Sequence, residues 1–189
     1  MKLSEAFART LRSRRFRVWQ IGGAVIYAIP VMIRYATGDV VIPILNFPGF
    51  WIGMVIPGNL LEKVLVNAFF PGGAGGVAGE ILVSNRRGDE PLRGRTKYLA
   101  RLGGALGQTA AWSLFQFLGY FLMIPGPKGG GNLFEMVFVF PINFVLASLS
   151  IFTPDVVYFT KSKMENTLKK LSKKLPEEDS QFKLNEIRR

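Results

Sequence analysis

The 189-residue chain contains no cysteine and no histidine, and these two absences exclude much chemistry. Without cysteine there is no disulfide, no thiolate nucleophile and no cysteine-ligated metal centre. Without histidine, neither a Ser-His-Asp triad nor a histidine-ligated haem can be built from this chain alone. The sequence also lacks H-E-x-x-H, G-x-S-x-G and acid-rich metal motifs. We therefore expect a protein that is not an enzyme and holds no cofactor or metal.

Acidic residues are also scarce, since 13 Asp and Glu stand against 24 Lys and Arg, a formal net charge of +11. The basic residues fall into three blocks, at residues 1–17, 84–101 and 161–189, and long stretches between the blocks carry almost no charge. A soluble nucleic-acid-binding protein would spread its charge over its helices, whereas basic caps that alternate with apolar runs are typical of a polytopic membrane protein. We therefore expect no nucleic-acid partner.

Long apolar runs are what the chain has in abundance, and 49% of its residues are hydrophobic. A helix needs about 20 mostly apolar residues to cross the hydrocarbon core of a bilayer. Residues 102–125 and 132–154 reach this length, and residues 18–36 reach it if Arg34 extends to the membrane surface. The remaining apolar segments are residues 40–57 and 60–83. The sequence predicts an all-α integral membrane protein of the cell membrane with four to five transmembrane helices. The first run does not resemble a cleavable signal peptide, because no small-residue cleavage site follows it.

Two parts of the chain resemble each other. Each reads F-x-G followed by aromatic residues, then Met, then I-P-G, and finally N-L-x-E-x-V-x-V. In each copy the Pro-Gly pair predicts a turn, and the Asn that follows is a favourable N-cap for the next helix. The similarity therefore predicts tandem helical hairpins at about residues 40–83 and 102–154.

The acids of the repeat, Glu62 and Glu135, permit two interpretations. In the first, each carboxylate stabilises the N-terminus of its own helix, next to the N-cap Asn59 or Asn132. In the second, the acids lie at equivalent depth and line a shared polar or transport site, because acids in membrane segments mark ion and substrate paths. Glu80 is a further candidate, because it follows a Gly-rich run that could bend the backbone toward a ligand or form a packing surface.

Small and polar residues within the apolar segments predict close contacts between helices. G-x-x-x-G motifs at residues 75–79 and 103–107 would allow two helices to approach closely, within the chain or with a partner. Asn67 and Asn143 are expected to form hydrogen bonds between helices. The aromatic residues near the ends of the spans are expected to lie at the membrane–water interface, and they are Trp19, Tyr35, Trp51, Trp112 and Tyr158.

The charge pattern and the repeat lead to different topologies. Five crossings would put the basic blocks 1–17 and 84–101 on opposite sides of the membrane, although basic segments favour the cytoplasm. Four crossings would make all three basic blocks cytoplasmic. We prefer four crossings, with either residues 18–36 or residues 40–57 forming only a partial membrane segment. The membrane domain would then cover residues 18–160, with a basic cytoplasmic N-terminal tail before it.

The third basic block, residues 161–189, contains a predicted amphipathic helix at residues 161–175. Its apolar positions are Met164, Leu168, Leu171 and Leu175. The other face carries Lys169, Lys170, Lys173 and Lys174, which suits binding to anionic lipids at a membrane surface or docking on a protein partner. Pro176 is expected to end this helix, and residues 177–189 are expected to be loosely structured.

Two classes of function remain. The repeat, the Pro- and Gly-rich helices and the acids at span ends favour a transporter or channel component for a small solute or ion. The small size, the few buried charges and the small-residue helix faces favour a non-catalytic structural or accessory subunit of a larger membrane complex, with other membrane subunits or a second copy as partner. The sequence names neither the solute nor the partner.

Overall fold

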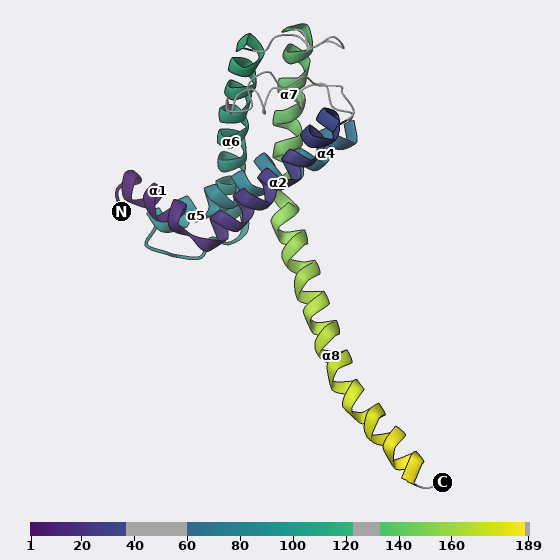
Figure 1. Cartoon of the computed structure of the whole chain (residues 1–189). Helices are drawn as coiled ribbons and strands as arrows, with labels where there is room; N and C mark the ends of the chain where they lie inside the picture. Colours follow the sequence, from purple (N-terminus) through teal and green to yellow (C-terminus); the bar gives the residue numbers. More distant parts are fainter. Residues whose placement is uncertain (37–59, 123–132, 188–189) are drawn as a thin grey trace. The chain divides into compact units, whose positions relative to one another are not determined.

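The computed structural model describes residues 1–36, 60–122 and 133–187, and these residues form helices and connecting turns without any β-strand. Residues 40–57, Asn59 and Asn132, which belong to the expected repeat, lie outside the described residues. The helices are α1 (Leu3–Arg12), α2 (Arg14–Ala36), α4 (Leu60–Phe69), the π-helix η1 (Phe70–Gly75), α5 (Gly76–Arg86), α6 (Gly94–Leu122), α7 (Leu133–Leu149), the 3₁₀-helix η2 (Ser150–Phe152) and α8 (Thr153–Ile187) (Figure 1).

The chain divides into two compact units, Met1–Thr153 and Pro154–Arg189. Unit 1 contains all the helices from α1 to η2, including the basic N-terminal segment, which we had expected to be a separate tail. Unit 2 consists of α8. Pro176 does not end this helix, which continues to Ile187 and so corrects the loose structure expected from residue 177 onward. A proline removes only one backbone donor, at a cost of about 3 kcal/mol, and the Glu, Lys and Leu residues after it favour a helix.

Among the described residues, one helical stretch is long and apolar enough to cross a membrane, namely Phe140–Ser172. Only 22% of its apolar window is buried. By this measure the described residues contain one of the four to five transmembrane helices expected from the sequence, and residues 40–57 lie outside them.

Residues 60–86 form a helix that changes its geometry at Pro71. Because Pro71 has no N–H group, it cannot donate the α-helical hydrogen bond to the residue four positions earlier, and the chain widens into the π-helix η1. All the residues from Pro71 to Gly75 are buried. The π-helix contacts α2, α4, α5, α6, α7 and η2, so it lies at the centre of unit 1 (Figure 1). The Gly-rich run is therefore a packing surface.

Glycine permits a close helix contact between α5 and α6. A β-carbon added to Gly79 would lie 2.8 Å from the Cα of Gly104, and one added to Gly104 would lie 2.7 Å from the Cα of Gly79. The expected motif at residues 75–79 is confirmed as a close helix contact, because Gly75 also packs against Gly104. The motif at residues 103–107 does not form this contact. Added β-carbons at Gly103 and Gly107 would meet nothing within 4 Å, because the two residues lie on an exposed side of α6.

Unit 1 exposes apolar side chains and buries polar ones. Large apolar side chains are between 47% and 68% exposed along several helices, namely Val18, Ile21, Val25, Ile29, Met32, Leu60, Leu61, Leu65, Leu114, Val145 and Leu149. The buried polar side chains are Thr10, Asn67, Arg101, Thr109, Ser113 and Asn143. Apolar side chains such as Val66, Val77 and Trp112 are also buried, so the unit has an apolar core as well as a large exposed apolar surface.

Candidate functional site

Glu80 joins three helices through two arginines. Its Oε2 accepts a hydrogen bond of 2.6 Å from Nε of Arg101 on α6, and its Oε1 accepts one of 2.9 Å from Nη1 of Arg15 on α2. The side chains are 12% exposed for Glu80, 1% for Arg101 and 38% for Arg15. A carboxylate so enclosed would be costly if it were alone, and the two guanidinium groups neutralise it. Glu80 therefore has a defined structural role that ties α5 to α2 and α6.

Arg101 also stabilises an irregular turn. Its Nη1 donates to the backbone carbonyl of Ile151 at 3.1 Å, and Ile151 lies in the 3₁₀-helix η2. A 3₁₀ turn within a longer helix changes the backbone pairing, so some carbonyls need other donors. The sequence grouped Arg101 with the basic surface loop 84–101, and this was wrong. The loop covers only residues 87–93, and α6 begins at Gly94.

Two amide pairs lie inside the same unit. Asn67 Nδ2 on α4 donates to Asn143 Oδ1 on α7 at 3.2 Å, which confirms the hydrogen bond between helices expected from the sequence. Gln20 and Gln108 donate to each other at 2.9 and 3.2 Å, and Gln108 also donates to the carbonyl of Phe70, where the π-helix begins. The glutamine pair was not foreseen, because nothing in the local sequence connects two glutamines that are 88 residues apart.

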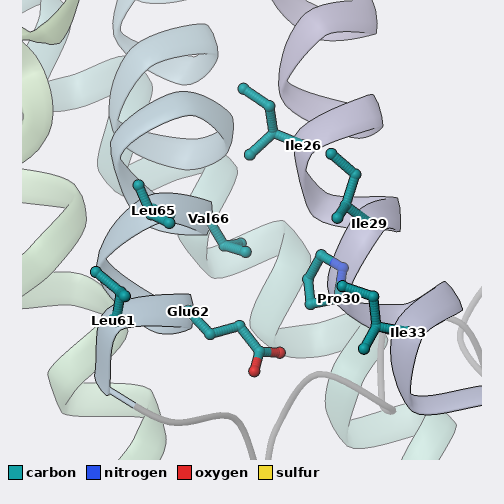
Figure 2. A pocket seen from close by; sticks show the side chains of 8 residues that line it. All are labelled: Ile26, Ile29, Pro30, Ile33, Leu61, Glu62, Leu65 and Val66. Carbon is teal, nitrogen blue, oxygen red and sulfur yellow. The ribbon is translucent and has the colours of Figure 1, made fainter. Parts of the chain in front are cut away.

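Glu62 lies in the first turn of α4, as the sequence predicted. Its side chain lines a pocket of about 340 Å³ between α2 and α4 (Figure 2). The other lining residues are all apolar, namely Ile26, Ile29, Pro30, Ile33, Leu61, Leu65 and Val66. Figure 2 shows the carboxylate of Glu62 directed from α4 into the space between the two helices. Among the described residues, the pocket therefore combines the Glu62 carboxylate with apolar walls.

An aromatic cluster joins α2, the π-helix η1 and α6. The ring of Tyr27 lies 5.8 Å from that of Phe70 and 5.7 Å from that of Trp112, measured between centroids. Trp112 is 4% exposed and Trp19 is 9% exposed, and Trp19 packs against Gly73 of the π-helix. The interfacial positions expected for these two tryptophans are therefore wrong, because both rings fill the interior. Tyr158 on α8 is 38% exposed.

The structure leaves the pairing of acids in the repeat untested. The side chain of Glu135 lies outside the described residues, so Glu62 and Glu135 cannot be compared in depth. Glu80 and Glu62 have different surroundings, since Glu80 is held by arginines and Glu62 faces apolar walls. In the parts of the chain that the structure describes, no group of three acidic side chains could hold a metal ion.

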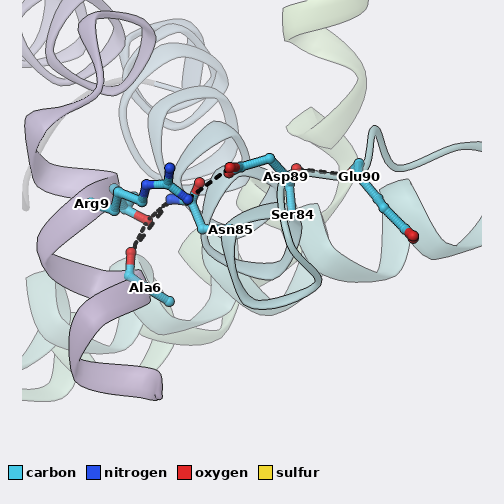
Figure 3. A network of polar contacts seen from close by, with 7 residues as sticks. Ala6, Arg9, Ser84, Asn85, Asp89 and Glu90 are labelled. Carbon is cyan, nitrogen blue, oxygen red and sulfur yellow. Dashed lines mark hydrogen bonds and ion pairs between the residues drawn. The ribbon is translucent and has the colours of Figure 1, made fainter. Parts of the chain in front are cut away.

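The N-terminal helix α1 is attached to the loop that follows α5 (Figure 3). Arg9 Nη1 donates to Asp89 Oδ2 at 2.7 Å, and Asn85 Nδ2 donates to Thr10 Oγ1 at 3.1 Å. In this loop, Gly88 and Asp89 lie in the left-handed region, at φ values of 84° and 68°. Their amide groups bond back to the last turn of α5, which ends the helix and directs Asp89 toward α1. Two of the three basic blocks are thus in contact.

The lysines of the third block lie in unit 2. Lys169 and Lys170 on α8 are exposed, and so are the apolar side chains of Met164, Leu168 and Leu171. The side chains of Lys173 and Lys174 lie outside the described residues. Binding of this helix to lipid therefore stays a prediction.

Comparisons of this chain with protein-family models, with curated proteins and with solved structures find no match.

Proposed function

We propose that this chain is an integral membrane protein that serves as a transport component for a small cationic solute, which binds in the Glu62 pocket. The observation that carries the proposal is the position of one carboxylate among apolar walls, between two helices with exposed apolar faces. A cation with an apolar body would satisfy both parts of this pocket. Its charge would pair with Glu62, and its body would displace water from the isoleucine side chains.

The exposed apolar side chains of unit 1 support a location within the bilayer. Water would make such surfaces aggregate, whereas lipid tails solvate them without cost. The paired interior groups Glu80–Arg101 and Asn67–Asn143 agree with this location, because a bilayer offers no water to an unpaired amide or charge. The low burial of Phe140–Ser172 supports the same conclusion, since a core helix of a soluble protein would be mostly buried.

The contact between α1 and the loop after α5 supports the four-crossing topology. Because Arg9 and Asp89 form an ion pair, the chain between them must return to the side of the membrane from which it started. Residues 14–84 would then cross the bilayer an even number of times. We infer that the basic blocks 1–17 and 84–101 share the cytoplasmic side, as their charge predicts.

The pocket can be tested with the full chain reconstituted in vesicles. We expect saturable binding and counterflow of radiolabelled tetraethylammonium in the unmodified protein, and loss of both in Glu62→Gln. Glu90→Gln is the matched control, because it removes the same charge from an exposed loop residue. Ile29→Trp should reduce binding by filling the pocket while leaving its charge in place. Equal binding in the unmodified protein and Glu62→Gln would refute the proposal.

One observation favours a second function, that of a non-catalytic accessory subunit. The Gly79–Gly104 contact and the Arg15–Glu80–Arg101 cluster hold α2, α5 and α6 together, as in a rigid scaffold. Purification from the native membrane in mild detergent would distinguish the two functions. A stoichiometric membrane partner, together with no solute binding by the purified chain alone, would favour the accessory subunit.

A further inference from the structure

Helix α1 has three distinct faces. Ala6 and Thr10 are 0% and 3% exposed and pack against α5. Leu3, Phe7 and Leu11 follow one another at intervals of four residues, so they form a single stripe along the helix. These three side chains are 59%, 55% and 45% exposed, so no described element of unit 1 covers this apolar stripe.

The charges of α1 lie away from its apolar stripe. At 100° per residue, Lys2, Arg9 and Arg12 fall on the side of the helix opposite Leu3, Phe7 and Leu11. Glu5 is the only acid in α1, so the helix is cationic. A short helix with an apolar stripe and an opposed basic face has the pattern of helices that lie in the plane of an anionic membrane surface.

The next helix also has an exposed apolar face. The backbone leaves helical geometry at Ser13, with ψ at 129°, and the chain bends there into α2. On α2 the exposed apolar face begins at Val18 and continues through Ile21 and Val25. A lipid leaflet would cover both faces at once, since the stripe of α1 would meet its surface and the face of α2 would enter its interior.

We propose that α1 is an in-plane membrane-surface helix whose Leu3, Phe7 and Leu11 insert at the boundary between headgroups and acyl chains of an anionic leaflet. This inference rests on the proposed membrane location of unit 1, but not on the solute pocket. The ion pair Arg9–Asp89 and the Asn85–Thr10 hydrogen bond hold α1 against α5 and its following loop. Helix α1 therefore sets the depth of residues 87–93 relative to the membrane surface. The basic side chains lie at the level of the lipid phosphates.

The test uses the reconstituted full chain, which offers clean single labelling because it contains no native cysteine. Phe7→Cys carries an environment-sensitive fluorophore in vesicles of phosphatidylglycerol and phosphatidylcholine, and lipids with a shallow spin label serve as quenchers. Glu5→Cys is the control on the opposite side of α1. This substitution removes a negative charge, so it cannot weaken the attraction of the helix to anionic lipid. We expect quenching at residue 7 to exceed that at residue 5 by about threefold or more.

Charge and membrane location are tested separately. Lys2→Glu with Arg12→Glu should decrease quenching at residue 7 in anionic vesicles and have little effect in pure phosphatidylcholine.

Val25→Cys on α2 should be quenched by lipids labelled deep in the acyl chain. Quenching at residue 25 with equal, weak quenching at residues 5 and 7 would overturn the surface helix and leave the membrane location standing. Absence of quenching at all three positions would refute both. Fluorescence at residue 7 that responds to dilution of the protein, and not to the quencher, would indicate a second copy as the occupant.

Discussion

Arg101 Nε lies 2.6 Å from Glu80 Oε2 while the arginine side chain is only 1% exposed, so a charge on α6 is enclosed against an acid on α5. Removal of one member leaves the other buried without its main partner. We expect Arg101→Met to lower the free energy of unfolding by about 3–5 kcal/mol. Arg15→Met should cost about 1 kcal/mol or less, because Arg15 is 38% exposed and solvent screens its contribution.

The same ion pair predicts that substitutions at Glu80 and Arg101 have non-additive effects on stability. Glu80→Leu combined with Arg101→Met removes both buried charges, so the loss of stability should be smaller than that of Arg101→Met alone. Unfolding of the purified protein in mixed micelles by a denaturing detergent would measure each variant. An Arg101→Met protein as stable as the unmodified chain would contradict the structural role of this pair.

Two adjacent glycines on α6 provide a matched test of the helix contact. Gly104→Ala places a methyl group against the backbone of Gly79 and should cost about 1–3 kcal/mol of stability. Gly103→Ala meets nothing within 4 Å, so we expect no loss, or a gain of up to about 1 kcal/mol from its higher helix propensity. Similar effects of the two substitutions in the same unfolding assay would show that α5 and α6 do not meet at Gly104.

The sequence predicted the local features of this chain better than the contacts between residues that are distant in the sequence. The helical class, the position of Glu62 in the first turn of α4 and the role of residues 75–79 follow from helix signals and small-residue spacing. The G-x-x-x-G spacing alone did not show which side of α6 packs against α5. Gly103 and Gly104 each stand four residues from another small or polar residue, so the two positions look alike in the sequence. Only the packing against Gly79 separates them.

Long-range pairing accounts for most of what sequence reasoning missed. Arg101 is one of many arginines in a basic segment, and no local signal distinguishes it from its exposed neighbours. Its burial depends on Glu80, which is 21 residues away, and on the carbonyl of Ile151, which is 50 residues away. Trp19 was assigned to the interface for the same reason, since its position near a span end is visible in the sequence and the gap beside Gly73 is not.

The Asn67–Asn143 hydrogen bond gives a further prediction. Asn67→Leu and Asn143→Leu should each destabilise the protein, because each leaves one buried amide without its partner across the helix interface. The double variant should be less destabilised than the sum, by a coupling of about 0.5–1.5 kcal/mol, which is the range for hydrogen bonds between membrane helices. Strict additivity would contradict a direct bond between the two side chains.

Lipid binding by unit 2 gives the last prediction. Lys169 and Lys170 are exposed on α8, and so are Met164, Leu168 and Leu171. A peptide of residues 161–175 should therefore gain helicity on anionic vesicles, where lysines meet phosphates and the apolar side chains enter the headgroup boundary. Each Lys→Gln substitution at these two positions should weaken partitioning roughly fivefold at low salt, and added salt should reduce this difference because it screens the surface charge. Circular dichroism and vesicle co-sedimentation measure both effects. Equal binding to neutral and anionic vesicles would exclude a charge-driven lipid contact and would favour docking of α8 on a protein.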